Sequence, residues 1–436
     1  MKIHLIGIGG IGVSALAQYY LAKGNEVSGS DLVASEITEM LEQKGIKIFI
    51  GNDAEFISKD LDLVVYSPAV EKNNPELLQA THYKLQTKSY PQALGELTKE
   101  HFTIAVSGTH GKSTTSSMMG LLLTQAGLDP TVIVGTKLKE FGNSNFREGK
   151  SKYLVIEADE HFASFLNYWP KIIVLTSLEA DHLDYYKTLE NLLSTFKEYV
   201  GHLPEDGILV ANKDDSNISE IFNLQFSISN KFSIKQFSIE QSEAEKIKEI
   251  MQIPGDYNVS NALAVLTVAR ILKIADEVVF KSLSEFKGTW RRFEVKEGSA
   301  NGKAITIVSD YGHHPTEVRV TLRAVREKYP DKKIWCVYQP HQYQRTFYLF
   351  DEFVKTFREV PIDKVIITDI YSVAGRESKE IKNKVNSEKL VKEINKDNVV
   401  YIPFGGVEKF IKENIDSGDV LVIMGAGDIY NLVERF

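Results

Sequence analysis

Short apolar runs recur along the chain, and each is followed by a turn and then by a longer segment with a helical pattern. The first runs cover residues 2–6, 26–28, 47–50 and 61–66. Runs of the same character follow at residues 103–106, 153–156, 172–176, 305–309, 334–338, 365–369 and 420–424. β-Branched residues are frequent in these runs, as is typical of short buried strands. Strands that alternate with helical segments predict an α/β fold built on mostly parallel sheets.

A glycine-rich turn follows the first apolar run. Gly7-Ile8-Gly9-Gly10-Ile11-Gly12 satisfies the pattern G-x-G-x-x-G, residues 13–22 then read as a helix, and Asp31 closes the next strand. Glycines let the backbone approach a diphosphate closely, and an acidic residue after the second strand can hold a ribose. The pattern therefore predicts a nucleotide diphosphate on a Rossmann-like turn. An NAD-dependent enzyme is its usual interpretation, but the pattern does not specify which nucleotide is bound.

A second glycine turn lies further along the chain. Residues 103–106 read as a strand, Gly108-Thr109-His110-Gly111-Lys112-Ser113 as a turn, and the residues after it as a helix. Backbone N–H groups of such a turn and the start of its helix attract phosphate. We expect Lys112 to neutralise the β- and γ-phosphates and the Ser113 hydroxyl to bind Mg²⁺. Val106 stands where the common pattern G-x-x-x-x-G-K-[ST] has its first glycine, so a plain strand-to-helix turn is the alternative.

Carboxylates and histidines follow later strands. Glu157-Ala158-Asp159-Glu160 comes directly after one apolar run, and its carboxylates suit Mg²⁺, which prefers oxygen ligands. A solvated acidic loop is the alternative interpretation. His182 lies in the segment T-S-L-E-A-D-H-L-D after the next run. The tandem histidines His313 and His314 do not predict zinc, because no cysteine or other well-placed histidine completes a site.

Composition limits the classes of function. A length of 436 residues suggests about three domains, and 43% apolar with 25% charged residues is normal for a globular protein. A formal net charge of −8 argues against nonspecific binding to nucleic acid or to an anionic membrane. Cys336 is the only cysteine, so no internal disulfide forms, and its apolar neighbours predict a buried thiol. No apolar run reaches membrane-spanning length, and we expect a cytoplasmic protein, monomeric or weakly dimeric, with small-molecule substrates.

In their order along the chain, these motifs resemble those of the Mur ligases, the amide-forming enzymes of peptidoglycan precursor synthesis. The resemblance covers the whole chain except residues 217–250, where we expect a strand or two and a short charged helix. It implies a Rossmann-like N-terminal domain at residues 1–100 and a central P-loop ATPase-like domain at 101–294. A Rossmann-like α/β domain at 295–436 would contact the amino acid and ATP. The implied cofactors are ATP and Mg²⁺.

The N-terminal motifs are similar to those of the Mur ligases that act on UDP-N-acetylmuramate and L-alanine. The similarity lies in GIGGIG, in the following GSD, and in SPAV with NNPE. It implies UDP-sugar contacts from Gly7, Gly9, Gly10, Ile11, Gly12, Asp31, Ser67, Pro68 and Ala69.

The resemblance also implies roles for residues of the central and C-terminal domains. Residues expected to bind ATP are Gly108, Thr109, His110, Gly111, Lys112, Ser113, Thr114, Asn258, Arg292, Asp310, His313 and His314. The expected metal ligands are Ser113, Glu157 and His182. The expected catalytic set is Lys112, Glu157, His182, Arg292, His341 and Arg345. Within it, Arg292 reaches the γ-phosphate and Arg345 holds the carboxylate of the amino acid.

Some positions depart from the family pattern. Tyr90 stands near a position that is often basic, and Tyr257 replaces a histidine. Gln342 replaces an arginine, Ser177 an asparagine and Gly312 an alanine.

The implied reaction is an ATP-dependent ligation. ATP phosphorylates the carboxylate of UDP-N-acetylmuramate, and the amine of L-alanine attacks the acyl phosphate. The base that accepts the proton of the amine stays open among His182, His341 and solvent. Two alternatives remain: a related ligase that recycles murein tripeptide onto UDP-N-acetylmuramate, and an NAD-dependent dehydrogenase or nucleotide sensor built on the first glycine turn.

Overall fold

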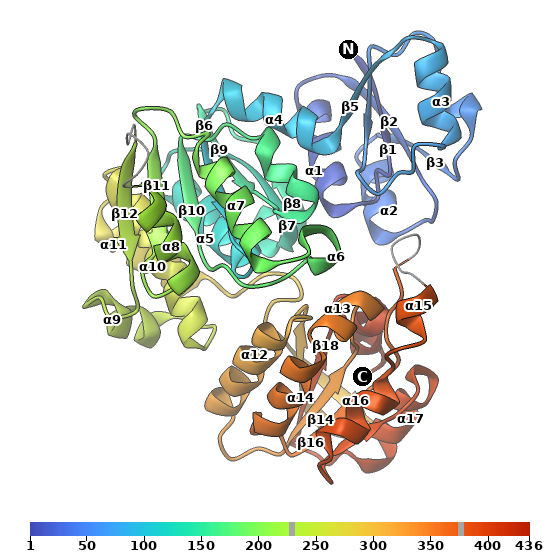
Figure 1. Cartoon of the computed structure of the whole chain (residues 1–436), viewed down its shortest axis with the longest axis vertical. Coiled ribbons are helices and arrows are strands. Elements are labelled where there is room, and N and C mark those ends of the chain that lie inside the picture. The colour runs from blue at the N-terminus through green and yellow to red at the C-terminus, as the bar shows by residue number, and fades with distance from the viewer. Residues whose placement is uncertain (226–231, 374–378) are drawn as a thin grey trace. The chain divides into compact units, whose positions relative to one another are not determined.

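The computed structural model describes residues 1–225, 232–373 and 379–436, which form two compact units (Figure 1). Unit 1 contains residues 1–178, 193–238 and 264–282, and unit 2 contains residues 179–192, 239–263 and 283–436. Three sheets organise the described residues, two in unit 1 and one in unit 2. The predicted α/β class is therefore confirmed.

The N-terminal sheet of unit 1 is parallel and has the strand order β3-β2-β1-β4-β5. Its strands are β1 (Lys2–Ile6), β2 (Glu26–Asp31), β3 (Lys47–Ile50), β4 (Leu63–Tyr66) and β5 (Gln86–Ser89). The helices of this region are α1 (Ile11–Ala22), α2 (Glu36–Gln43), α3 (Pro75–His82) and α4 (Tyr90–Glu100), with a short 3₁₀ helix η1 (Ala54–Phe56). The strand order reverses between β1 and β4, and ligands bind at such a point in open α/β sheets. Both predicted UDP-sugar segments follow these two strands.

The second sheet of unit 1 has the order β12-β11-β10-β6-β9-β7-β8, and only its β7–β8 pair is antiparallel. Its strands are β6 (Phe102–Ser107), β7 (Thr131–Leu138), β8 (Ser144–Arg147), β9 (Tyr153–Glu157), β10 (Ile172–Leu175), β11 (Ile208–Asn212) and β12 (Ser233–Phe237). The helices are α5 (Lys112–Gln125) and α8 (Ser216–Gln225), with the 3₁₀ helices η2 (Lys139–Phe141) and η3 (His161–Asn167). Three further helices have residues in both units: α7 (Leu189–Val200), α10 (Asp256–Ile271) and α11 (Asp276–Glu285).

The sheet of unit 2 has the order β13-β14-β18-β15-β16-β17, and only its β13–β14 pair is antiparallel. Its strands are β13 (Glu294–Ala300), β14 (Lys303–Asp310), β15 (Ile334–Tyr338), β16 (Lys364–Ile367), β17 (Val399–Tyr401) and β18 (Val420–Met424). The helices are α6 (Leu183–Tyr186), α9 (Glu243–Ile250), α12 (Pro315–Lys328), α13 (Tyr343–Tyr348), α14 (Phe350–Glu359), α15 (Lys379–Lys382), α16 (Ser387–Ile394), α17 (Phe404–Asn414) and the 3₁₀ helix η4 (Asp428–Arg435).

Alternate residues of β15 enter two different hydrophobic cores. Ile334, Cys336 and Tyr338 belong to one core, and Trp335 and Val337 belong to the other. Both faces of this sheet are therefore covered, as expected for a mostly parallel sheet. The buried thiol predicted at the only cysteine is confirmed, and burial raises its pKa.

The segment 217–250 contains one described strand, β12, and the short charged helix α9, as predicted. It also contains most of helix α8, which the sequence interpretation did not anticipate. Residues 226–231 of this segment lie outside the described part of the chain. Among the described helices, none is long and apolar enough to cross a bilayer.

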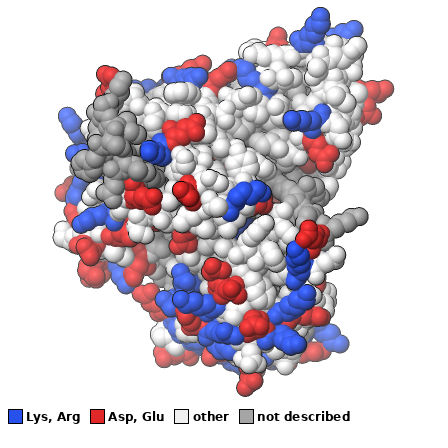
Figure 2. All heavy atoms as spheres, viewed as in Figure 1, with Lys and Arg blue, Asp and Glu red and all other residues white. Residues whose placement is uncertain are grey.

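Acidic and basic side chains are interspersed over the face shown in Figure 2. In unit 2, Lys412 and Arg435 both form ion pairs with Glu408, at 2.6 Å and 2.9 Å. Ion pairs at a protein surface contribute little to stability, because water and salt screen them. The fold therefore depends on its cores rather than on these charges.

A fully buried polar cluster lies beneath the first glycine turn. Nε2 of His4 on β1 lies 2.9 Å from the Glu76 carboxylate at the start of α3, and Ser30 donates to the same carboxylate at 2.8 Å. The Ser30 carbonyl in turn accepts the N–H groups of Gly7 at 2.8 Å and Ile8 at 3.0 Å. Glu76 therefore orients the strand that supports the turn.

Replacing Glu76 with alanine should lower the free energy of unfolding of the full chain by about 3 kcal/mol, because His4 and Ser30 lose their buried partner. Urea denaturation measures the change. Glu71 lies in the loop that precedes α3 and has an exposed side chain, so Glu71→Ala should change the free energy of unfolding by less than about 0.5 kcal/mol. Equal effects of the two substitutions would contradict a supporting role for the cluster.

Candidate active site

The predicted phosphate loop, residues 108–111, joins β6 to α5, and Lys112, Ser113 and Thr114 begin α5. Gly108 has φ +129° and Gly111 has φ +83°, conformations that favour glycine. A Cβ atom on Gly108 would lie 2.4 Å from the Thr176 hydroxyl oxygen. The Ser177 carbonyl accepts the Thr109 N–H at 2.7 Å, so this tight turn is held against the end of β10.

Lys112 lies at the start of α5 with its amine folded back over the loop. Its Nζ donates to the Gly108 carbonyl at 2.6 Å and to the buried Glu160 carboxylate at 2.9 Å. Burial by itself would lower the pKa of Lys112, but the carboxylates of Glu160, Asp159 and Glu157 outweigh it and raise the pKa. The loop therefore holds a permanently charged amine, as a phosphate site requires.

Ser113 and Glu157 come together beside this loop. The Ser113 hydroxyl donates to one Glu157 carboxylate oxygen at 3.0 Å, and the Gly135 N–H donates to the other at 2.8 Å. A Cβ atom on Gly135 would lie 2.7 Å from that second oxygen. A hydroxyl and an oriented carboxylate are oxygen donors that fit Mg²⁺. Sequence reasoning missed Gly135, although a glycine inside an apolar strand indicates a close approach.

The first glycine turn is built around two close contacts. The Gly9 N–H donates to the Asp31 carboxylate at 2.8 Å, so this acid also orients the turn. A Cβ atom on Gly12 would lie 2.8 Å from Cζ of Tyr90, so the phenol ring occupies the space that a side chain would need. Gly10 precedes α1, and Ile11 and Gly12 form its first turn.

The second predicted UDP-sugar segment lies beside the same turn. A Cβ atom on Gly7 would lie 2.9 Å from Cβ of Ser67, which directly follows β4. Ser67, Pro68 and Ala69 form a turn closed by the Val70 N–H, which donates to the Ser67 carbonyl at 2.9 Å. The structure thus gathers the residues predicted for the UDP-sugar at the carboxyl ends of strands β1, β2 and β4 of the N-terminal sheet.

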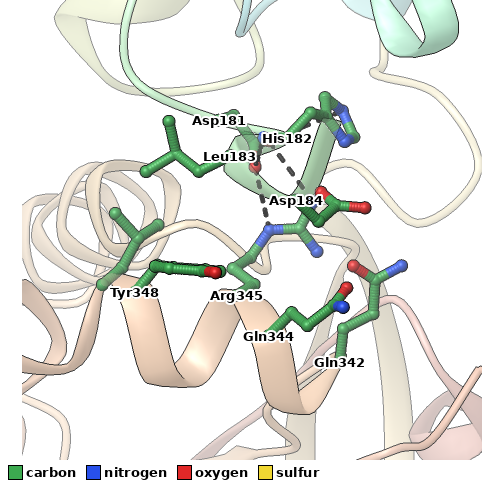
Figure 3. A pocket seen from close by; sticks show the side chains of 9 residues that line it. Asp181, His182, Leu183, Asp184, Gln342, Gln344, Arg345 and Tyr348 are labelled. Atoms are coloured by element: carbon green, nitrogen blue, oxygen red, sulfur yellow. Dashed lines mark hydrogen bonds and ion pairs between the residues drawn. The ribbon is translucent and has the colours of Figure 1, made fainter. Parts of the chain in front are cut away.

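In unit 2, a pocket forms where α6 and α13 meet (Figure 3). Its lining residues are Asp181, His182, Leu183, Asp184, Gln342, Gln344, Arg345, Tyr348 and Leu349. Figure 3 shows the Arg345 guanidinium directed at Asp181, and its Nε donates to the carboxylate at 3.1 Å. Both residues are buried, with 7% and 6% exposure.

This ion pair controls the charge of the pocket. Burial alone would raise the pKa of Asp181, but Arg345 and nearby histidines hold it well below its ordinary value. Arg345 also donates to Nδ1 of His341 at 3.3 Å, and the His341 ring stacks on Tyr371. Sequence reasoning predicted Arg345 and His341 but missed Asp181 as the partner of Arg345.

His182 lies at the edge of the same pocket. It precedes α6 with φ +52°, and its Nε2 lies 3.8 Å from the Asp181 carboxylate. The predicted metal set combined His182 with Ser113 and Glu157. The structure brings Ser113 and Glu157 together in unit 1, while His182 is part of unit 2, so its inclusion stays a prediction.

The D-Y-G-H-H segment begins with the last residue of β14 and is held by hydrogen bonds to backbone N–H groups. Asp310 accepts the N–H groups of Phe293 at 2.9 Å and Gly312 at 2.8 Å, and burial raises its pKa to about 6. Nδ1 of His314 accepts the Thr316 N–H at 3.2 Å and caps α12. Roles for these residues in ATP binding stay predictions, since part of their hydrogen-bonding capacity is already used within the protein.

His313 should remain neutral in the folded protein. Burial lowers its pKa to about 3, and the Glu317 carboxylate offsets only part of that effect. A group with a depressed basic pKa binds its proton only after unfolding, so stability is lost as pH falls from about 6.5 toward 3. Between pH 7 and pH 5, we expect His313 to account for about 2 kcal/mol of lost unfolding free energy.

Urea denaturation of the wild type and of His313→Asn, each at pH 7 and pH 5, measures this contribution. The wild type should lose about 2 kcal/mol more than the variant over this interval. An equal pH dependence of the two proteins would show that His313 is not held neutral.

The remaining predicted ATP contacts also lie in unit 2. Arg292 places its guanidinium 4.8 Å from the Tyr311 ring centre and 3.7 Å from the Glu317 carboxylate. Asn258 is buried and donates to the Pro254 carbonyl at 2.7 Å. Tyr257, which departs from the family pattern, packs against the core of unit 2.

Three protein-family models match the chain in succession. They are described as the Mur ligase catalytic domain at residues 2–102, the Mur ligase middle domain at 106–269 and the Mur ligase glutamate ligase domain at 291–427. A UDP-N-acetylmuramate–L-alanine ligase of Acetivibrio thermocellus is 41% identical over 100% of this chain and 95% of its own length. One from Clostridium kluyveri is 38% identical over 100% of this chain and 97% of its own length.

Solved structures show the same architecture. The crystal structure of a UDP-N-acetylmuramate–alanine ligase from Thermotoga maritima matches with a TM-score of 0.78 and 26% identity, over 100% of this chain and 98% of that one. A murein peptide ligase from Psychrobacter arcticus matches with a TM-score of 0.74 and 24% identity over the same shares.

Proposed function

This chain belongs to the Mur ligase family, and we propose that it joins L-alanine to the carboxylate of UDP-N-acetylmuramate at the expense of ATP. The observation that carries the proposal is the full-length similarity to ligases of that name. The paired contacts of Lys112 with Glu160 and of Ser113 with Glu157 supply the chemistry that the reaction needs.

The reaction proceeds in two displacements. A carboxylate oxygen of UDP-N-acetylmuramate attacks the γ-phosphorus of ATP, and ADP leaves with the electrons of the broken bond. The amine of L-alanine then attacks the acyl carbon of the resulting acyl phosphate, and inorganic phosphate leaves as the amide forms. The amine loses one proton to a base, and the candidates are His182, which lines the pocket in unit 2, His341, which contacts Arg345, and solvent.

The first displacement brings two anions together, so the site must offset their repulsion. Lys112 supplies a fixed positive charge at the phosphate loop, and Arg292 supplies a second charge for the γ-phosphate. Ser113 and Glu157 would hold Mg²⁺, which adds positive charge to the phosphate oxygens when it is bound. Glu160 keeps the Lys112 amine oriented within the loop.

The UDP-sugar binds at the first glycine turn, where the N-terminus of α1 faces the diphosphate. L-Alanine binds in the pocket of unit 2, with its carboxylate on Arg345. Asp181 holds that guanidinium in a fixed plane and sets the charge that surrounds the amino acid. We place the domain boundaries at residues 1–100, 101–294 and 295–436, and the reaction in the cytoplasm.

The test mixes the purified protein with ATP, Mg²⁺ and UDP-N-acetylmuramate and measures phosphate release after adding L-alanine, L-serine, glycine or murein tripeptide. L-Alanine should support the fastest release, with formation of the UDP-N-acetylmuramoyl-alanine product. Release with the tripeptide in place of L-alanine would assign the recycling reaction instead. Binding of NADH without ATP hydrolysis would refute the ligase assignment altogether.

A further inference from the structure

A strained turn leads into the sheet of unit 2. The Arg292 N–H donates to the Thr289 carbonyl at 3.0 Å and closes the turn, and Arg291 inside it has φ +57°. A left-handed conformation favours glycine or asparagine and costs another residue about 1 kcal/mol or more. An arginine in this conformation therefore calls for a compensating interaction of its side chain.

The Arg291 side chain is captured by the turn that follows β18. Its guanidinium donates to the Gly425 carbonyl at 2.6 Å and to the Gly427 carbonyl at 3.3 Å. Only 6% of the residue is exposed, and burial lowers the pKa of the guanidinium. An arginine nevertheless stays charged, so this is a buried cation held by carbonyl oxygens.

Aromatic rings complete the surroundings of this cation. The guanidinium carbon of Arg291 lies 4.4 Å from the ring centre of Tyr430, 4.9 Å from that of Tyr311 and 5.4 Å from that of Trp290. Cation–π contacts at such distances are favourable, and more so where water is excluded. A planar guanidinium can use ring faces and paired carbonyls together, whereas an ammonium group cannot.

Backbone contacts connect this clamp to Arg292 on both sides. Before it, the Arg291 carbonyl accepts the Tyr311 N–H at 2.7 Å. After it, the Phe293 N–H donates to the Asp310 carboxylate at 2.9 Å. The Arg292 guanidinium lies over the same Tyr311 ring that Arg291 contacts. The backbone of Arg292 is thus held on both sides, and its guanidinium also lies 3.7 Å from the Glu317 carboxylate.

We propose that Arg291 is a positioning residue for Arg292. By clamping the turn at residues 289–292 onto the ends of β14 and β18, it presents the Arg292 guanidinium to the γ-phosphate in one orientation. The inference rests on the proposed function, because only the ligase reaction gives Arg292 a phosphate to contact. The inference adds Arg291 to that function, as a residue that affects the phosphate only through Arg292.

Two substitutions test the clamp. Arg291→Gly removes the side chain and also relieves the left-handed backbone, so the turn should still form, yet kcat/KM for ATP should fall about 100-fold through misplacement of Arg292. Arg291→Lys keeps the positive charge but loses the planar guanidinium, so kcat/KM for ATP should fall by about 10-fold. Arg323 has an exposed side chain on α12, so Arg323→Lys is the matched control and should match the wild type.

The effect of Arg291→Gly on kcat/KM is measured again in the Arg292→Ala variant. This comparison distinguishes positioning of Arg292 from a purely structural role of Arg291. If Arg291 acts through Arg292, then Arg291→Gly should change kcat/KM by less than about threefold once Arg292 is absent. If Arg291→Gly lowered kcat/KM by the same factor with and without Arg292, the inference would be overturned. A wild-type kcat/KM in Arg291→Gly would overturn it too. If Arg291→Gly fails to fold, Arg291→Lys takes its place in the same comparison. A wild-type protein that releases no phosphate would instead reject the proposed function.

Discussion

Replacing Lys112 with methionine should reduce ATP-dependent phosphate release by about 1,000-fold. Methionine has similar length but no charge, so the loop keeps its shape and loses the amine that is proposed to neutralise the phosphates. The Lys112 amine contacts the Gly108 carbonyl and the Glu160 carboxylate, which hold it over the loop. Phosphate release in the presence of both substrates measures the effect, with the KM for L-alanine recorded alongside.

A loss of folding could imitate this result, because Glu160 would be buried without its partner. The double substitution Lys112→Met with Glu160→Gln removes both charges together and should restore stability but not activity. Lys355 is exposed on α14, and Lys355→Met should leave the rate unchanged. Substantial turnover in the folded double variant would contradict the role given to the lysine.

Replacing Arg345 with methionine should raise the KM for L-alanine by about 100-fold or more, while the KM for ATP stays near its original value. The arginine is proposed to hold the carboxylate of the amino acid, and this contact is made in the substrate complex as well as later in the reaction. Initial rates over a range of L-alanine concentrations measure the change.

The same substitution also leaves the Asp181 carboxylate buried and unpaired, at a cost of about 3–5 kcal/mol. Asp181→Asn combined with Arg345→Met removes that cost and tests the binding role in a stable protein. We expect this double variant to unfold near the wild-type Tm and still to require far more L-alanine. Arg323→Met is the control for loss of an arginine from an exposed position. A wild-type KM for L-alanine in the double variant would show that the amino acid binds elsewhere.

The alternation of strands and helices could be read directly from the sequence, because strand and turn signals are local. The runs at 47–50, 334–338 and 420–424 coincide with β3, β15 and β18. The ends of the strands were predicted less well. Strand β2 extends to Asp31, three residues beyond the predicted run, because Asp31 pairs with Ile50 of β3. Such pairing involves a partner strand that local patterns do not identify.

The residues of the candidate site were predicted only in part, because the sequence shows local patterns but not the partners that distant segments provide. Glycine turns followed by helices are contiguous in the chain, so the sequence identified both glycine turns and placed Lys112 and Ser113 correctly at the start of α5. It could not supply their partners. Gly135, whose N–H orients Glu157, sits on a strand that neighbours β9 only through the order of the sheet.

By itself, then, the sequence determined the α/β class, the two glycine turns and the family to which the chain belongs, since each is encoded in short contiguous segments. Only the tertiary structure decided which charges meet. Arg345 pairs with Asp181 across 164 positions, and Arg291 reaches the carbonyl of Gly425 across 134. Contacts of this kind depend on strand order and on the burial of opposite charges, and neither leaves a local pattern in the chain.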